Sequence, residues 1–337
     1  MLKEQGKIGG RWFFWLMLFV IMLLLMRDPV LCGDLIKRGG GIVLNKALPA
    51  VFPYLVLSSL FFESGFPMLF RGRIARVLGR LLSLPDICIS GIVMGLFAGF
   101  PLGASFAAGL YKEGYCQKEE AERLSALSGF PSPPFLLAAF GQGVMGSPMA
   151  GVLLYFVQTV TVLLYGILLG RRSRKRKGQG GNFINEEQAG RKRKPAPSHG
   201  MPAKPVPSLF SAVGQCIGAA ALQMVRIGGF ILAFSLLSGV ILELFDPLFV
   251  RFPLLEAPVA GFFEISSGVA HMKAGGALGM LIGGLCLSFS GLSVHMQVAG
   301  FLDPAGLSVK EHLLAHVRLC PIIAVAAAAL CALFDLF

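Results

Sequence analysis

The sequence contains few charged residues for its length. Asp, Glu, Lys and Arg make up 14% of its 337 residues, whereas a soluble globular domain carries about a quarter. Hydrophobic residues make up 55%, and the mean hydropathy is +0.72. The shortage of charge excludes an ordinary soluble domain, because this much apolar surface needs lipid around it.

The sequence also lacks the usual patterns of a disulfide framework or an enzyme. Its seven cysteines are scattered, with no CxxC pair and no Cys/His cluster at metal spacing. A Gly-x-Ser-x-Gly elbow and a phosphate-binding loop are both missing. His312 and His316 have the spacing of a zinc motif, but Leu313 stands where the catalytic Glu would follow the first His. We expect free buried thiols, no bound metal, no organic cofactor and no enzymatic activity.

Positive charge is abundant but concentrated in one place. The formal net charge is +12, and 11 of the 30 Lys and Arg lie between Arg171 and Lys204. No basic patch is interleaved with aromatic residues, so we expect no nucleic-acid partner. The positive-inside rule instead favours a cytoplasmic loop. The proline-rich composition of residues 171–207 predicts a disordered linker between two membrane units, residues 40–170 and 208–337.

Several apolar segments are long enough to lie in a bilayer. The first, Trp12–Met26, follows Lys3, Lys7 and Arg11, and we expect an uncleaved span within residues 1–30 that runs from inside to outside. A removed signal peptide is the alternative. A short polar stretch, residues 28–46, follows. Further apolar segments are 47–62, 87–110, 149–169, 212–244 and 316–333. In residues 66–83, arginines alternate with apolar residues, which predicts an amphipathic helix on an anionic membrane surface.

Two apolar segments are interrupted at related places. The third is broken at residues 99–103, and the segment 258–271 is broken at 261–268. A shift of 162 residues superimposes these interruptions and also places Ser128–Gly129 on Ser290–Gly291. We predict an all-α polytopic membrane protein: an inverted-topology repeat with broken helices and two re-entrant hairpins. The hairpins are expected at the two Ser-Gly tips, the first entering from outside and the second from inside.

Glu264 is a carboxylate within an apolar segment. An ionised group at the centre of a bilayer costs about 2.5–3.5 kcal/mol on insertion scales. We therefore predict that Glu264 senses a proton or another coupling ion, H+ or Na+, or hydrogen-bonds the substrate; a position nearer the interface is the alternative. His295 is a second candidate for proton coupling, and packing is its alternative role.

Small and polar residues concentrate around the interruptions. Helix N-termini there would expose N–H groups, which favour an anionic ligand. Close helix packing is the alternative explanation for the glycines. The residues predicted to bind substrate are Pro101, Gly103, Ser128, Gly129, Ser132, Ser266, Ser267, Ser290, Gly291, Ser293 and Gln297.

At these motifs the chain resembles a known family. Residues 99–104, 110–114 and 118–124 in the first half, with 263–268 and 288–297 in the second, look like the YlbJ (SpoVV) family of sporulation integral membrane proteins. The resemblance covers roughly residues 40–335. It implies a nucleoside-recognition, or gate, domain fold related to the concentrative nucleoside transporters.

The resemblance also implies a function. It predicts export of dipicolinic acid, a small aromatic dicarboxylate, from the mother cell across the outer forespore membrane. A nucleoside or other small-molecule carrier, and a non-transporting scaffold acting through the basic linker, are the alternatives. The expected partners are the small anionic substrate, the lipid bilayer, and a small membrane protein or a second copy of the chain.

Overall fold

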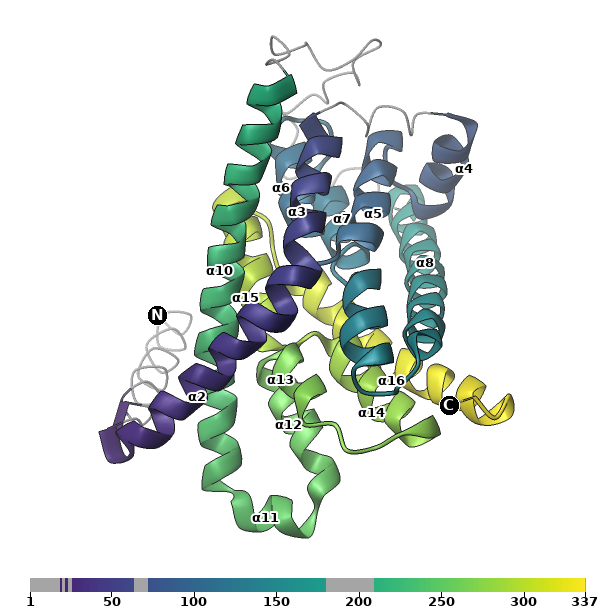
Figure 1. Ribbon diagram of the computed structural model, residues 1–337. Coiled ribbons are helices and arrows are strands. Elements are labelled where there is room, and N and C mark those ends of the chain that lie inside the picture. The colour runs from purple at the N-terminus through teal and green to yellow at the C-terminus, as the bar shows by residue number, and fades with distance from the viewer. Residues whose placement is uncertain (1–18, 20–21, 24–25, 64–71, 180–208, 337) are drawn as a thin grey trace, which may run out of the picture.

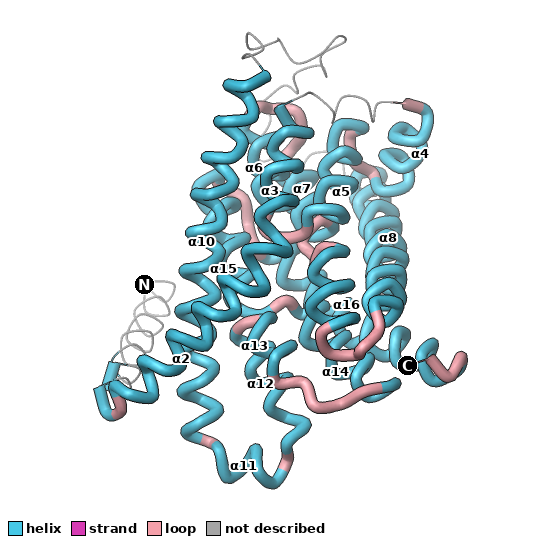
Figure 2. Tube along the Cα trace, viewed as in Figure 1, coloured by secondary structure: helices cyan, strands magenta, loops and turns pink. Residues whose placement is uncertain are grey.

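The computed structural model of the protein describes residues 19, 22–23, 26–63, 72–179 and 209–336, and in these ranges every regular element is helical (Figures 1 and 2). The first half contains α2 (Pro29–Ile42), η1 (Val43–Ala47), α3 (Leu48–Glu63), α4 (Arg73–Leu82), α5 (Asp86–Ala98), α6 (Leu102–Lys112), α7 (Lys118–Leu127), η3 (Phe135–Gln142) and α8 (Pro148–Gln179). The second half contains α10 (Leu209–Leu244), α11 (Asp246–Arg251), η4 (Pro253–Leu255), α12 (Glu256–Phe263), α13 (Ile265–Ala270), α14 (Gly276–Phe289), α15 (Gly291–Leu302), η5 (Asp303–Ala305) and α16 (Lys310–Leu333).

The described helices confirm the all-α polytopic membrane fold. Four helical stretches in the described ranges are long and apolar enough to cross a membrane: Pro148–Arg174, Phe210–Leu244, Gly276–Ala305 and Lys310–Leu333. The number rises to six if the bent pairs α2/η1–α3 and α4–α5 each count as one span. The predicted segments 149–169, 212–244 and 316–333 therefore correspond to α8, α10 and α16.

The two re-entrant hairpins lie where the sequence predicts breaks, not where it predicts tips. α5 and α6 pack against each other around the turn at Gly99–Pro101, and α12 and α13 do so around Glu264. The Ser-Gly positions instead lie between α7 and η3 and between α14 and α15. The second of these pairs, Gly276–Ala305, counts as one membrane span. The expectation of Ser-Gly hairpin tips is thus wrong, because the segment 87–110 folds back at Gly99 instead of crossing.

This difference reverses the direction of each hairpin. Figure 1 shows α5 and α6 entering from the end of the molecule where α8 finishes and α10 begins, and α12 and α13 entering from the opposite end. Arginines gather at the α8–α10 end: Arg73, Arg76, Arg80, Arg171, Arg172 and Arg174. By the positive-inside rule we expect this end to be cytoplasmic. On that expectation the first hairpin enters from inside and the second from outside, the reverse of the direction expected for the Ser-Gly hairpins.

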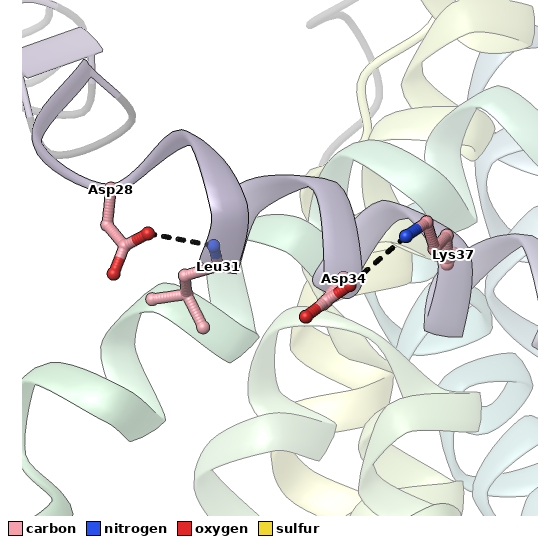
Figure 3. Close-up of polar contacts among 4 residues, drawn as sticks. All are labelled: Asp28, Leu31, Asp34 and Lys37. Atoms are coloured by element: carbon pink, nitrogen blue, oxygen red, sulfur yellow. Dashed lines mark hydrogen bonds and ion pairs between the residues drawn. The ribbon is translucent and has the colours of Figure 1, made fainter.

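The segment read as a polar stretch, residues 28–46, is helical. Asp28 begins α2 by accepting a hydrogen bond from the Leu31 amide at 2.9 Å, and Pro29 occupies the first turn, where a missing N–H costs nothing (Figure 3). Lys37 pairs with Asp34 at 3.3 Å on the exposed face of the same helix. The local charges thus lie on one side of a helix that continues through η1 into α3.

The structure describes only part of three other predicted segments: the linker, the first span and the amphipathic helix. Residues 171–179 continue α8 as helix, so the expectation that disorder begins at residue 171 is wrong there, since a long span simply extends past the apolar region. Residues 180–207 of the linker lie outside the described residues, as does most of the predicted first span. The amphipathic helix is confirmed over its described part, α4, which turns by 89° into α5.

Candidate functional site

A cavity lies at the centre of the fold, where both hairpin turns and both broken spans meet. About 40 Å3 of it is open to the centres of water molecules, which is room for roughly three ordered waters. Its walls come from η1 and α3, from the α5–α6 turn, from the α7–η3 break, and from α10, α12–α13 and α15. The lining residues are Ala47, Val51, Tyr54, Ala98, Phe100, Ser132, Phe135, Ile227, Ile231, Glu264, Ile265, Ser266, Val294 and Gln297.

The first hairpin closes tightly around the first broken span. Gly99 has φ +71°, a left-handed conformation that favours glycine, and a Cβ there would lie 2.8 Å from the Ser132 amide nitrogen. A Cβ added at Gly95 on one arm or at Gly103 on the other would collide with Ser128. Because Gly95 and Gly103 have no side chain, the two arms of the hairpin can pack directly against the end of α7.

The second broken span is bent by two consecutive residues with positive φ. Ser290 has φ 73° and Gly291 has φ 76°. The Ser290 hydroxyl donates to the Leu287 carbonyl at 3.1 Å, which satisfies one of the acceptors that the break leaves open. A Cβ on Gly291 would lie 2.9 Å from the Gly261 carbonyl oxygen and 3.3 Å from the Glu264 amide nitrogen. The start of α15 thus rests directly on the turn of the second hairpin.

Glu264 lies at the turn of the second hairpin, and its side chain is 1% exposed. One carboxylate oxygen accepts a hydrogen bond from the Ser267 amide at 2.7 Å, so the residue caps α13. The Ser267 hydroxyl in turn lies 2.9 Å from the Ser235 hydroxyl on α10. Glu264 also lines the cavity, so that its carboxyl group is buried among helices from both halves of the chain.

The predicted substrate-binding residues fall into two groups. Ser132, Ser266 and Gln297 line the cavity together with Glu264. The others lie behind its wall, where they allow helices to approach or close hydrogen bonds within the protein. These residues are Pro101, Gly103, Ser128, Gly129, Ser267, Ser290, Gly291 and Ser293. Ser128, for example, donates to the Leu124 carbonyl at 2.7 Å.

Sequence reasoning missed most of the apolar wall. Tyr54 from α3, Phe135 from η3 and Ile227 and Ile231 from α10 line the cavity. Nothing distinguishes them in the sequence from other apolar residues of the same spans, so only their assembly in three dimensions identifies them. Lys and Arg do not occur among the lining residues.

Three histidines form a buried cluster at the two helix breaks. His295 on α15 and His312 and His316 on α16 are 4%, 0% and 0% exposed. The ring centroids lie 4.4 to 5.2 Å apart, and His316 stacks on Phe130 of the first break at 4.2 Å. His295, which the sequence analysis assigned to proton coupling, belongs to this cluster and not to the cavity wall. Among the described residues, no three His, Cys, Asp or Glu side chains are arranged to hold a metal ion.

The comparisons with known proteins fit this arrangement of helices. The chain is 25% identical over 307 residues to sporulation integral membrane protein YlbJ of Bacillus subtilis (strain 168), an alignment that covers 83% of this chain and 73% of that protein. No family model matches the chain, and no solved structure matches it significantly. The match supports the resemblance seen in the motifs: the chain is similar to YlbJ, a sporulation integral membrane protein.

Proposed function

We propose that the protein is a membrane transporter that moves a small anionic aromatic solute, dipicolinic acid, during sporulation, from the mother cell across the outer forespore membrane. The observation that carries the proposal is the central cavity, because two inverted hairpins and two broken spans all end at it. Non-helical backbone at membrane depth is tolerated only where protein or a water-lined cavity covers it. Such breaks recur at the substrate sites of secondary transporters.

The lining chemistry suits a flat ring with polar ends. Tyr54, Phe100 and Phe135 offer aromatic faces, and Ser132 and Gln297 offer hydrogen-bonding groups. Helices α6 and α15 also begin near the centre, and helix N-termini favour negative charge. The relative's name ties it to sporulation, and this supports a sporulation role for the present chain.

Charge sets a condition on the substrate. The cavity contains the Glu264 carboxyl group and has no Lys or Arg in its lining. A dianion beside an ionised carboxylate in a low-dielectric site would be strongly repelled. The proposal therefore requires that Glu264 be protonated, or that a cation enter with the solute, when dipicolinate binds.

Flux measured with purified protein in proteoliposomes tests the proposal. We expect dipicolinate to move and uridine not to move. Glu264→Gln is expected to reduce dipicolinate flux at least about tenfold, because the proton- or ion-responsive group is lost. Glu256→Gln is the matched control, since Glu256 lies on the same hairpin but pairs with Lys273 at the surface, and it should keep its flux.

The other outcomes identify the alternatives. Uridine flux without dipicolinate flux would favour a nucleoside carrier. Flux of neither solute, together with a sporulation defect when residues 175–200 are deleted but none with Glu264→Gln, would overturn transport in favour of a scaffold that recruits partners through the basic linker.

A further inference from the structure

The hydrogen bonds of the histidine cluster fix where each ring holds its proton. A carbonyl oxygen only accepts, so His316 Nδ1 donates to the Ser288 carbonyl at 2.7 Å and His312 Nδ1 donates to the Ser125 carbonyl at 3.4 Å. A neutral imidazole has one N–H, so His312 Nε2 is an acceptor. His295 Nδ1, 3.1 Å from it, is then the donor.

This assignment leaves two free lone pairs inside the protein. His295 Nε2 and His316 Nε2 are buried and have no hydrogen-bond partner. The two rings lie 5.1 Å apart between centroids. A buried acceptor without a hydrogen bond is unfavourable, so its presence in a folded protein needs an explanation. A bare imidazole nitrogen can accept a proton.

The cluster also joins the two halves of the fold. Ser125 and Phe130 belong to α7 and the break that follows it, while Ser288 lies at the end of α14 just before the Ser290–Gly291 break. His312 further packs on Gly129, where a Cβ would collide with its ring. The neutral rings therefore connect the break between α7 and η3 with the break between α14 and α15.

Among the residues that the structure describes, no charged side chain forms a hydrogen bond or an ion pair with the rings of the cluster. Of the neighbours on the packed helices, Glu122 on α7 accepts from the Ser308 amide, Cys286 on α14 and Cys320 on α16 donate to backbone carbonyls, and Arg318 on α16 donates to Tyr165. Glu311, half-buried, precedes His312 at the start of α16. A buried imidazolium without a carboxylate partner is costly.

We propose that His295, His312 and His316 form a second proton site, separate from Glu264, that controls access to the cavity: the neutral cluster holds the two helix breaks together, and a proton arriving at a bare Nε2 separates them and opens the cavity. The inference rests on the proposed transport function and adds a pH-dependent opening step to it. The arrangement with buried neutral histidines is favoured at higher pH and is lost as the pH falls, because the opened arrangement binds more protons.

Cysteine labelling tests the opening without any substrate. Ala98→Cys places a thiol in the cavity wall beside the first break, where the side chain is 6% exposed. Labelling at that peptide by a membrane-impermeant thiol reagent is compared at one pH between the otherwise native chain and the chain with His295→Gln and His316→Gln. For one coupled proton, the opened population rises by up to about tenfold per pH unit. At each pH the labelling rate with the histidines present is divided by the rate with glutamines, which cancels the loss of reactive thiolate at low pH. We expect this ratio to be higher at pH 5.5 than at pH 7.5.

His271→Gln is the matched control, because His271 lies at the end of α13 outside the cluster and bonds the Ser267 carbonyl. It should keep the pH response. An equal response in the glutamine double variant would overturn the proposal. If labelling responds to pH through the cluster but dipicolinate does not move, the proposed substrate is wrong and the proposed proton site still stands.

A measurement on the unsubstituted protein tests the proposal even if the variants do not fold. With 15N-labelled histidine, NMR distinguishes which ring nitrogen holds the proton in each of the five histidines. We expect the three rings of the cluster to be protonated on Nδ1 at pH 8, and His271 as well, since its Nδ1 lies 2.8 Å from the Ser267 carbonyl. Protonation on Nε2 in any ring of the cluster would overturn the proposal, because the free lone pairs would then not exist.

Discussion

Gly291, at the first position of α15, lies against the Gly261 carbonyl in the second hairpin, so close that a Cβ there would stand 2.9 Å from the oxygen. Its φ is 76°, which L-residues with a side chain adopt only at a cost. The contact joins a broken span to a hairpin turn at the wall of the cavity. Backbone packing at glycine thus sets the position of the Glu264 carboxyl group.

Gly291→Ala should therefore destabilise the protein. We expect a loss of about 2 kcal/mol from the left-handed conformation alone, and a further cost from contact with the hairpin. Thermal unfolding in detergent measures the effect. Gly300→Ala in the same helix is the control, since nothing lies within 4 Å of a Cβ there, and it should be neutral or stabilising. Equal melting temperatures for the two variants would contradict the proposed contact.

Gly95→Ala should loosen the first hairpin. The added methyl group would collide with Ser128, and overpacking of this kind costs about 1–3 kcal/mol. We expect lower stability and weaker solute flux, because the hairpin turn would shift away from the α7–η3 break. Gly109→Ala on the other arm has open space around its Cβ and serves as the control. Unchanged flux in Gly95→Ala would show that the hairpin's contact with Ser128 does not matter for transport.

Ser235→Ala should weaken the attachment of the second hairpin to α10. The Ser235 hydroxyl lies 2.9 Å from that of Ser267, and both are buried. Removing one partner leaves the other hydroxyl unsatisfied and costs about 1–3 kcal/mol. Ser238→Ala is the comparison, because Ser238 bonds only a carbonyl of its own helix. Denaturation of both variants in detergent measures the difference, and a larger loss in Ser238→Ala would be contrary to the expectation.

Charge reversal on α4 should reduce the protein's response to anionic lipid. Arg73, Arg76 and Arg80 are exposed beside the exposed apolar side chains of Ile74 and Val77. Each basic residue near an anionic membrane surface contributes about 1 kcal/mol to the free energy of binding to that surface.

The measurement is the shift in melting temperature when phosphatidylglycerol replaces phosphatidylcholine in nanodiscs. We expect Arg73→Glu, Arg76→Glu and Arg80→Glu together to abolish the shift. Arg251→Glu, in α11 at the opposite end of the molecule (Figure 1), is the control and should leave it intact. A shift that persists in the triple variant would show that α4 does not lie on the lipid surface.

Composition and residue pattern were enough to predict that the chain lies in a membrane and that breaks occur near Gly99, Ser128, Glu264 and Ser290. Composition and charge placement act over long stretches of chain, so they are readable without coordinates. Glu264 was identifiable for a related reason: an isolated carboxylate in an apolar run has few structural explanations.

Which interrupted segment turns back and which continues became clear from the packing of the helices. α5 and α14 are similarly apolar, but α5 ends where Gly95 and Gly103 allow the arms to close around Ser128, whereas Ser290 and Gly291 bend a span that continues. That distinction depends on contacts between distant segments. The same holds for the histidine cluster, because His295 at the start of α15 reaches His312 and His316 only when α14 packs against α16.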